Sequence, residues 1–333
     1  MNEINRQVIL IARPAGIAQV EHFAVRHGAI TLPGPGEILV RNHYLSVEPA
    51  MRGWIADSDN YAAPIAIGSV MRALAAGQVV ASGDDAYQVG DYVAGWFGWQ
   101  EHACVPTDQV VQRTSEAEMR ASLGILGING VTAFLALTLI GQPRAGDTVL
   151  VSTAAGAVGS AVGQIARLMG CRTIGIAGGP DKVRRCVDQF GYDSAIDYRG
   201  EDVGAALARI APQGIDIYFD NVAGRISDAV LPHLAMRGRV VVCGTASIDR
   251  WSPWPQGPRV ERHLLVKRAR MEGFVIFDHM DRYGDAIAQL RAWIALGQLT
   301  WREEILDGID TCPDALAGLY RGENDGKRLI RLV

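Results

Sequence analysis

One segment near the middle of the chain restricts the possible folds more than any other. Residues 149–159 run from an apolar strand through a turn of small residues into a helix, whose apolar stripe continues to Met169. Ala154, Gly156 and Gly159 have the spacing of a G-x-G-x-x-G fingerprint, with alanine in the first position. Glycine at such a turn lets backbone N–H groups approach a pyrophosphate at the positive end of a helix. The segment therefore predicts a dinucleotide site.

Strand-like and helix-like runs alternate around this segment, from residue 148 to residue 296. This alternation is typical of a parallel sheet covered by helices on both faces. Six strands fit a dinucleotide-binding unit. The predicted strands are residues 148–152, 173–177, 194–197, 215–220, 239–243 and 273–277.

The first 126 residues have a different sequence pattern. Short apolar runs at residues 37–40, 77–81 and 92–94 are separated by turns rich in Gly, Pro and Asp, which predicts antiparallel β structure, a sandwich or a barrel. The last 35 residues are expected to return to this first part, through strand-like runs at 301–306 and 328–333 and a short helix at 313–320. We therefore expect a substrate domain at 1–126 with 298–333, and a dinucleotide-binding domain at 127–297.

Composition and charge exclude several classes of protein. The net charge is −4 and the basic residues are scattered, which argues against a nucleic-acid partner. The first twenty residues do not resemble a secretory signal, and the most apolar stretches, such as 131–140, are too short to cross a bilayer. The five cysteines are widely spaced, and neither they nor the seven histidines form a metal-binding pair. We expect a cytoplasmic protein with reduced thiols, no metal and no membrane contact.

The end of the second predicted strand indicates which dinucleotide is bound. An NAD enzyme places an acidic residue there for the ribose hydroxyls. This chain instead reads Ile176-Ala-Gly-Gly-Pro-Asp-Lys182, where the glycines leave room for a 2′-phosphate and Lys182 would neutralise it. The alternative is that Lys182 belongs to a solvated helix face. The missing acid favours NADPH.

Polar residues follow two further predicted strands, at the sheet edge where open α/β sheets bind ligands. Asn221 comes directly after residues 215–220, and Gly244 follows the next strand. Asn221 would donate a hydrogen bond to the cofactor, although Asp-Asn is also common in turns. Gly244 and its neighbours are expected to border the nicotinamide half.

With these features in place, the sequence resembles the zinc-independent medium-chain dehydrogenase/reductase superfamily, in its leukotriene B4 dehydrogenase, prostaglandin reductase and alkenal double-bond reductase branch. The resemblance covers nearly the whole chain. It rests on Tyr44-Leu-Ser-Val-Glu-Pro-Ala-Met-Arg52, Gly90-Asp-Tyr-Val93, Gly98-Trp-Gln100, Gly130-Val-Thr-Ala-Phe134, Ala154-Ala-Gly-Ala-Val-Gly159, Tyr218-Phe-Asp-Asn221, Met271-Glu-Gly-Phe274 and Gly322-Glu-Asn-Asp-Gly-Lys327.

The resemblance implies an α/β fold in which a Rossmann doubly wound parallel sheet is combined with a GroES-like β-barrel substrate domain. It also implies a homodimer formed through the last Rossmann strand, and cofactor contacts that extend into the C-terminal segment. The implied cofactor-binding residues are Gly156, Ala157, Val158, Gly159, Lys182, Tyr198, Asn221, Cys243, Gly244, Thr245, Ala246, Ser247, Phe274, Val275, Ile276 and Asn324.

The reaction implied by the resemblance is metal-free hydride transfer from NADPH to the C=C bond of a small α,β-unsaturated aldehyde or ketone. The enolate that develops then needs hydrogen-bond donors. This chain has Ala50 and Val266 where family members often carry tyrosines, so Tyr61 and Arg52 become the candidate catalytic residues. Both also have purely structural interpretations. A quinone or carbonyl reductase and a non-catalytic NADPH-binding protein remain alternatives, because the fold does not fix the substrate.

Overall fold

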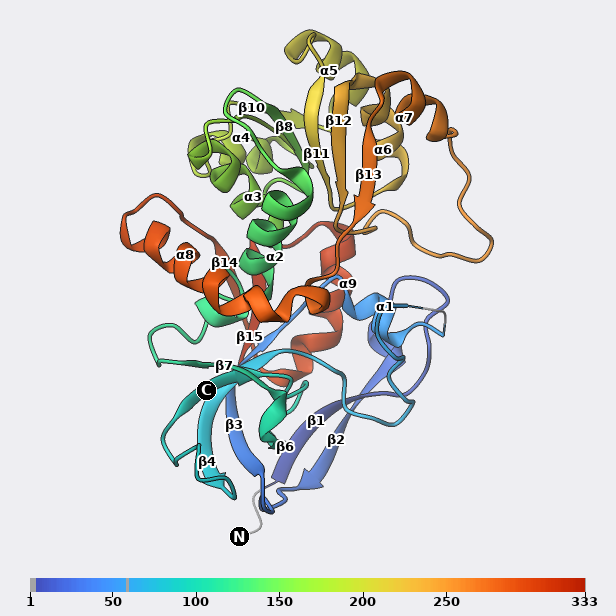
Figure 1. Cartoon of the computed structure of the whole chain (residues 1–333). Helices are drawn as coiled ribbons and strands as arrows, with labels where there is room; N and C mark the ends of the chain where they lie inside the picture. Colours follow the sequence, from blue (N-terminus) through green and yellow to red (C-terminus); the bar gives the residue numbers. More distant parts are fainter. Residues whose placement is uncertain (1–3, 58–59, 333) are drawn as a thin grey trace. The chain divides into compact units, whose positions relative to one another are not determined.

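The computed structural model describes residues 4–57 and 60–332, and the chain divides into two compact units (Figure 1). Unit 1 comprises Met1–Gly124 together with Glu303–Val333, and unit 2 comprises Ile125–Arg302. No helix in the described ranges is both long enough and apolar enough to cross a membrane.

Unit 2 is built on a six-stranded parallel sheet in the order β10-β9-β8-β11-β12-β13. The chain leaves β8 in one direction towards β9 and β10, and later returns to add β11, β12 and β13 on the other side. The strand order therefore reverses beside β8, which is where open α/β sheets bind ligands. The strands are β8 (Thr148–Ser152), β9 (Arg172–Ala177), β10 (Ser194–Asp197), β11 (Ile215–Asp220), β12 (Leu234–Val242) and β13 (Arg270–Gly273).

Helices lie on both sides of this sheet (Figure 1). Leu150 and Tyr218 share one core cluster with residues of α5 and α6, whereas Val149 and Val151, on the opposite face of β8, are also fully buried. The helical elements are α2 (Ile128–Ala136), η4 (Leu137–Gly141), α3 (Ala157–Leu168), α4 (Pro180–Asp188), α5 (Val203–Ile210), α6 (Gly224–Val230), η5 (Leu231–His233), α7 (Glu261–Lys267), η6 (Ile276–Arg282) and α8 (Tyr283–Ala295).

The predicted alternation is confirmed, but the last strand was predicted wrongly. β13 is Arg270–Gly273 rather than 273–277. The Phe274 N–H still donates to the Val242 carbonyl at 3.0 Å, after which the chain leaves the sheet and Ile276–Arg282 forms a 3₁₀ helix. Phe274 is buried by stacking on the His279 ring, 5.0 Å away between centroids. A short apolar run has no period that separates a strand from such a buried turn.

Unit 1 contains a seven-stranded sheet in the order β14-β15-β3-β4-β5-β7, with β6 paired to β3. All of its pairs are antiparallel except β14 with β15. Strand β15 pairs with β3, which confirms that the C-terminal segment returns to the first part of the chain. The strands of this sheet are β3 (Glu37–Ser46), β4 (Ala75–Ser82), β5 (Tyr92–Gly95), β6 (His102–Pro106), β7 (Val110–Thr114), β14 (Glu303–Asp307) and β15 (Lys327–Arg331).

A two-stranded ribbon and several helices complete unit 1. Helix α9 begins with Pro313 in its first turn and ends at Gly322, whose φ of 73° suits glycine. The remaining elements are β1 (Ile4–Leu10), β2 (Phe23–Ala29), η1 (Val20–His22), α1 (Met51–Ile55), η2 (Thr107–Gln109), η3 (Ala121–Leu123), η7 (Ile309–Thr311) and α9 (Cys312–Arg321).

Candidate functional site

The turn between β8 and α3 has the shape that the glycine fingerprint predicts. Gly156 is the N-cap of α3, and no side chain caps the helix there. A Cβ atom at Gly159 would lie 2.3 Å from the Thr153 carbonyl oxygen, and one at Gly156 would lie 2.9 Å from the Thr153 side chain. Only glycine therefore allows this close turn. It leaves the first N–H groups of a twelve-residue helix available to a phosphate, so the turn fits a dinucleotide.

A buried carboxylate organises the carboxyl ends of β8 and β11. Asp220 is 3% exposed, and its side chain accepts hydrogen bonds from the Tyr218 and Ser227 hydroxyls and from the N–H groups of Val222 and Ala223. These donors distribute the negative charge without a neighbouring cation among them. Burial and the Asp220 charge together raise the pKa of the Tyr218 phenol well above its usual value, so this hydroxyl remains a donor.

This network fixes Asn221. The Asn221 backbone N–H donates to Ser152 Oγ at 2.8 Å, and its side-chain Nδ2 donates to the Ser152 carbonyl oxygen at 2.7 Å. The Asp220 carbonyl oxygen accepts the N–H groups of Cys243 and Gly244 at 2.8 and 3.1 Å. The ends of β8, β11 and β12 are thereby held together at one sheet edge.

The segment after β12 is held against the same edge. The Ser247 hydroxyl donates to the carbonyls of Val222 and Ala223, and a Cβ atom at Gly244 would lie 2.8 Å from the Asn221 carbonyl oxygen. Phe274, which follows β13, bonds to the end of β12. The structure thus places one group of predicted residues along this edge: Gly156, Ala157, Val158, Gly159, Asn221, Cys243, Gly244, Thr245, Ala246, Ser247, Phe274, Val275 and Ile276.

Lys182 and Tyr198 lie apart from that group, beyond β9 and β10. Lys182 is in the first turn of α4, which begins after Gly179. Gly178 packs under Tyr198 and Arg199, because a Cβ atom at Gly178 would lie 2.9 Å from the Tyr198 ring and 3.1 Å from Arg199 Nε. The Arg199 guanidinium also lies over the Tyr198 ring, 5.8 Å from its centroid. One cation, Arg199, therefore lies beside Gly178, and Lys182 follows Gly179 by three residues in the first turn of α4.

An acidic residue does approach this position, although it comes from β10. The Asp197 carboxylate accepts the N–H groups of Gly179 at 2.8 Å and Arg199 at 3.0 Å, and these bonds lower its pKa, with the Gly179 bond as the largest cause. The same oxygen thus holds the β9–α4 turn and the start of the Tyr198–Arg199 segment. It is committed to the backbone rather than to a ribose hydroxyl.

The other predicted residues belong to unit 1. Arg52 lies in α1, and its guanidinium carbon is 4.7 Å from the centre of the Tyr320 ring. Tyr61 is 53% exposed and is close enough to Tyr320 to raise the pKa of that phenol. Asn324 donates a hydrogen bond to the Gly326 carbonyl at 3.0 Å. Arg52 thus lies against Tyr320, which the sequence did not single out.

Comparison with known proteins gives a consistent picture across the chain. A model described as the N-terminal domain of oxidoreductase matches residues 6–112, and a model described as zinc-binding dehydrogenase matches residues 157–292. The NADPH-dependent curcumin reductase of Escherichia coli (strain K12) is 39% identical over 335 residues, which are 99% of this chain and 97% of that protein. The chain belongs to the zinc-independent medium-chain dehydrogenase/reductase superfamily.

Two further relatives of this dehydrogenase/reductase are informative. The NADP(+)-dependent 2-alkenal reductase of Nicotiana tabacum is 36% identical, over 98% of this chain and 97% of the relative. CurA from Vibrio vulnificus, solved in complex with NADPH, is 40% identical with a TM-score of 0.93, over 98% of this chain and 99% of that one. The predicted fold class, a Rossmann sheet with a GroES-like domain, is confirmed.

The side chains of this medium-chain dehydrogenase/reductase do not form a metal centre in the part that the structure describes. Within residues 4–57 and 60–332, no group of three or more His, Cys, Asp or Glu side chains lies close enough together to hold a metal ion. Cys243, at the sheet edge, has its pKa raised to about 12 by burial and by Asp220, so its thiol is protonated at neutral pH.

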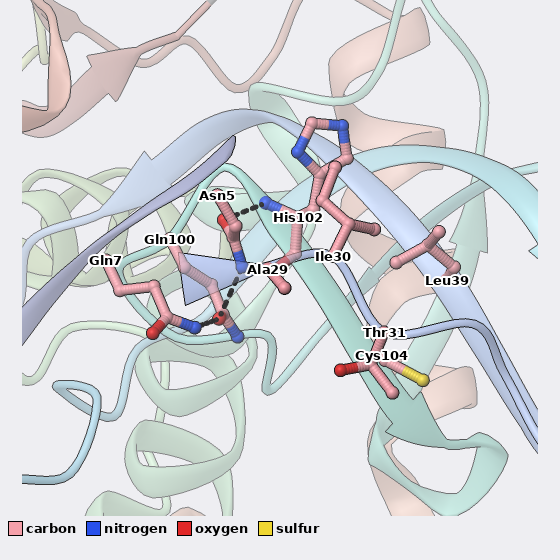
Figure 2. A pocket seen from close by; sticks show the side chains of 9 residues that line it. All are labelled: Asn5, Gln7, Ala29, Ile30, Thr31, Leu39, Gln100, His102 and Cys104. Carbon is pink, nitrogen blue, oxygen red and sulfur yellow. Dashed lines mark hydrogen bonds between the residues drawn. The ribbon is translucent and has the colours of Figure 1, made fainter. Parts of the chain in front are cut away.

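Figure 2 shows a small polar cavity in unit 1 that lies apart from every predicted site residue. Its volume is about 120 Å³, and its amide side chains bond to one another. Asn5 Oδ1 accepts the His102 N–H at 2.9 Å, and Gln7 donates to Gln100 at 2.7 Å. These bonds join β1 to β6 and the segment before it, so we interpret the cavity as part of the domain core.

Proposed function

We propose that this protein is an NADPH-dependent reductase, acting on CH–CH groups, that transfers hydride to the C=C bond of a small α,β-unsaturated aldehyde or ketone. The observation that carries this proposal is the 36–39% identity, across both units, to reductases named for curcumin and 2-alkenals. Bound NADPH would supply the hydride to the β-carbon, and solvent would supply the proton that the α-carbon of the enolate then takes. The chain supplies binding and orientation, and no metal step is invoked.

Unit 2 contains the residues that we propose bind the cofactor. The N–H groups of Ala157, Val158 and Gly159 receive the pyrophosphate, which Gly156 allows to approach the turn, and Asn221 and the Cys243–Ser247 segment border the nicotinamide half. The Ser152–Asp220 network gives Asn221 a fixed direction, so its amide needs no reorganisation when the cofactor binds. We assign residues 127–297 to this cofactor domain, and residues 1–126 with 298–333, including Asn324, to the substrate domain.

In the substrate domain, we propose that Tyr61 and Arg52 bind the carbonyl oxygen of the substrate. Negative charge develops on this oxygen as the enolate forms, and hydrogen-bond donors aimed at it lower the barrier. Ala50 and Val266 offer no phenol for this purpose. Tyr61, which is 53% exposed, and the guanidinium of Arg52, which lies over the Tyr320 ring, are the donors that we assign to this role.

The direct test compares substrates that contain a C=C bond conjugated to a carbonyl with a saturated aldehyde and with a quinone. NADPH oxidation should be rapid with a 2-alkenal and with an enone, and the product should be the saturated carbonyl compound by mass spectrometry. The corresponding saturated aldehyde and a quinone are the matched controls, and a chelator should leave the rate unchanged. Reduction of the quinone or the saturated aldehyde alone would contradict the proposal. NADPH binding without turnover of any substrate would indicate a non-catalytic protein.

We also propose a homodimer that forms through β13. This strand is at the edge of the parallel sheet, where its outer N–H and C=O groups can pair with a second copy. Exposed apolar side chains lie nearby in sequence, with Leu265 78% exposed and Val266 49% exposed on α7. A dimer of this kind would cover them.

The Leu265→Glu variant should convert the dimer to a monomer in light scattering after gel filtration, because a buried carboxylate without a partner is costly. Leu296→Glu is the matched control, since Leu296 is 70% exposed in the same unit but lies beyond α8. A wild-type protein that elutes as a monomer, or an equal effect of both variants, would contradict the proposed interface.

We place this enzyme in the cytoplasm. The five cysteines are free, and burial raises the pKa of each thiol, which suits a reducing compartment. Fractionation of cells that express the full-length chain should recover it with cytoplasmic markers, and recovery with a membrane fraction would contradict this location.

A further inference from the structure

Tyr320 makes two contacts with the segment that carries Arg52. It lies near the end of α9, more than 260 residues away in the sequence. Its ring lies under the Arg52 guanidinium at 4.7 Å, and its hydroxyl donates to the Pro49 carbonyl oxygen. Pro49 and Arg52 are the two ends of one turn, because the Arg52 N–H also donates to the Pro49 carbonyl at 3.2 Å. The Tyr320 side chain therefore contacts both the backbone of this turn, at Pro49, and the guanidinium of Arg52.

The phenol of Tyr320 remains protonated near neutral pH. Burial, with a smaller contribution from Tyr61, raises its pKa to about 12 against the opposing effect of the Arg52 charge. The hydroxyl is therefore a lasting donor to Pro49 rather than a source of protons. The ring limits the directions that the Arg52 guanidinium can take, because stacking favours one planar arrangement of its fork of N–H groups.

We propose that Tyr320 is a positioning residue that orients Arg52, beside Tyr61, for binding the carbonyl oxygen of the substrate. This inference rests on the proposed function of Arg52 and Tyr61. It assigns the C-terminal helix α9 a part in substrate binding through a side chain rather than only through packing. Tyr320 touches neither the substrate nor the cofactor in this scheme, so its effect must pass through Arg52.

The Tyr320→Leu variant should lower kcat/KM for a 2-alkenal about tenfold, which corresponds to about 1.4 kcal/mol, while the KM for NADPH stays unchanged. Tyr320→Phe keeps the ring and should recover most of the loss. Because Tyr320 acts through Arg52, adding Tyr320→Leu to Arg52→Ala should cause no further decrease. Additive losses in the double variant would overturn the inference.

The matched control is the Tyr87–Arg113 pair, in which Arg113 lies 4.5 Å from the Tyr87 ring elsewhere in unit 1. Tyr87→Leu removes the same kind of stack and should leave the kinetics unchanged. If Tyr320 has only a structural role, Tyr87→Leu and Tyr320→Leu should have similar kinetics when their melting temperatures are similar. That result would also overturn the inference.

A second measurement does not depend on turnover. Phenylglyoxal labels accessible guanidinium groups, and peptide mass spectrometry reports the rate at each arginine. Arg52 should be labelled several times faster in Tyr320→Leu than in the wild type, and Arg113 should not change. Unchanged labelling of Arg52 would overturn the inference even if the wild type reduced no alkenal. Loss of alkenal turnover in the wild type, with faster labelling in the variant, would count against the proposed function alone.

Discussion

The Lys327→Met variant is expected to lose about 3–5 kcal/mol of free energy of unfolding, the usual cost of leaving one buried charge without its partner. Lys327 is 4% exposed at its side chain and Glu48 is 8% exposed. The ammonium donates to Glu48 Oε1 at 2.6 Å, to Ser46 Oγ at 2.7 Å and to the Val47 carbonyl at 3.0 Å. Burial lowers the pKa of Lys327, and Glu48 opposes this shift. Methionine would fill the space but leave the Glu48 carboxylate uncompensated.

Urea unfolding of the full chain measures this loss. A second substitution separates the lost charge from lost packing, because Glu48→Gln in the Lys327→Met background removes the stranded carboxylate and should restore part of the stability. Arg331→Met is the control, since Arg331 is on the same strand as Lys327, β15, but pairs with Asp307 of β14 at an exposed position, where an ion pair contributes little. A Lys327→Met variant as stable as Arg331→Met would contradict this account.

The central strands of the parallel sheet could be predicted closely because they are buried on both faces and bounded by turn residues. The ranges 148–152, 194–197 and 215–220 match the strands at both ends. The predicted strand 273–277 failed where the sequence signal was only a short apolar run, since Phe274 is buried by His279 in a turn rather than by a neighbouring strand. Pattern alone does not separate these two causes of burial.

The candidate site could be predicted where its residues form one turn or follow neighbouring parallel strands, but not where side chains of distant elements meet. The glycines from Gly156 to Gly159 form one turn, so their spacing carries the signal. Tyr320 meets Arg52 only because β15 pairs with β3 and brings α9 with it, and no spacing in the sequence indicates that contact. Arg199 follows β10, whereas Gly178 follows β9. The two residues meet only because β10 pairs with β9.

The Lys182→Ala, Arg199→Ala double variant should lose NADPH affinity by a factor of about 100 or more, because each charge-assisted bond to a phosphate contributes about 1.5–3 kcal/mol. Its affinity for NADH, which lacks the 2′-phosphate, should barely change. Lys182 lies in the first turn of α4, and Arg199 packs over Tyr198 beside Gly178. Fluorescence titration with both cofactors measures the two affinities.

The single variants show whether both cations act, since each should account for part of the loss. Arg184→Ala is the matched control, because Arg184 is on the same helix but pairs with Asp181 on an exposed face. The NADPH affinity of the wild type should fall more steeply with salt concentration than that of the double variant, because the double variant has fewer cationic side chains that contact the phosphate. Equal losses for NADPH and NADH would mean that these side chains support the fold of the β9–α4 turn rather than bind a phosphate. In that case Asp197, which holds the N–H groups of Gly179 and Arg199, would be the residue that shapes this end of the site.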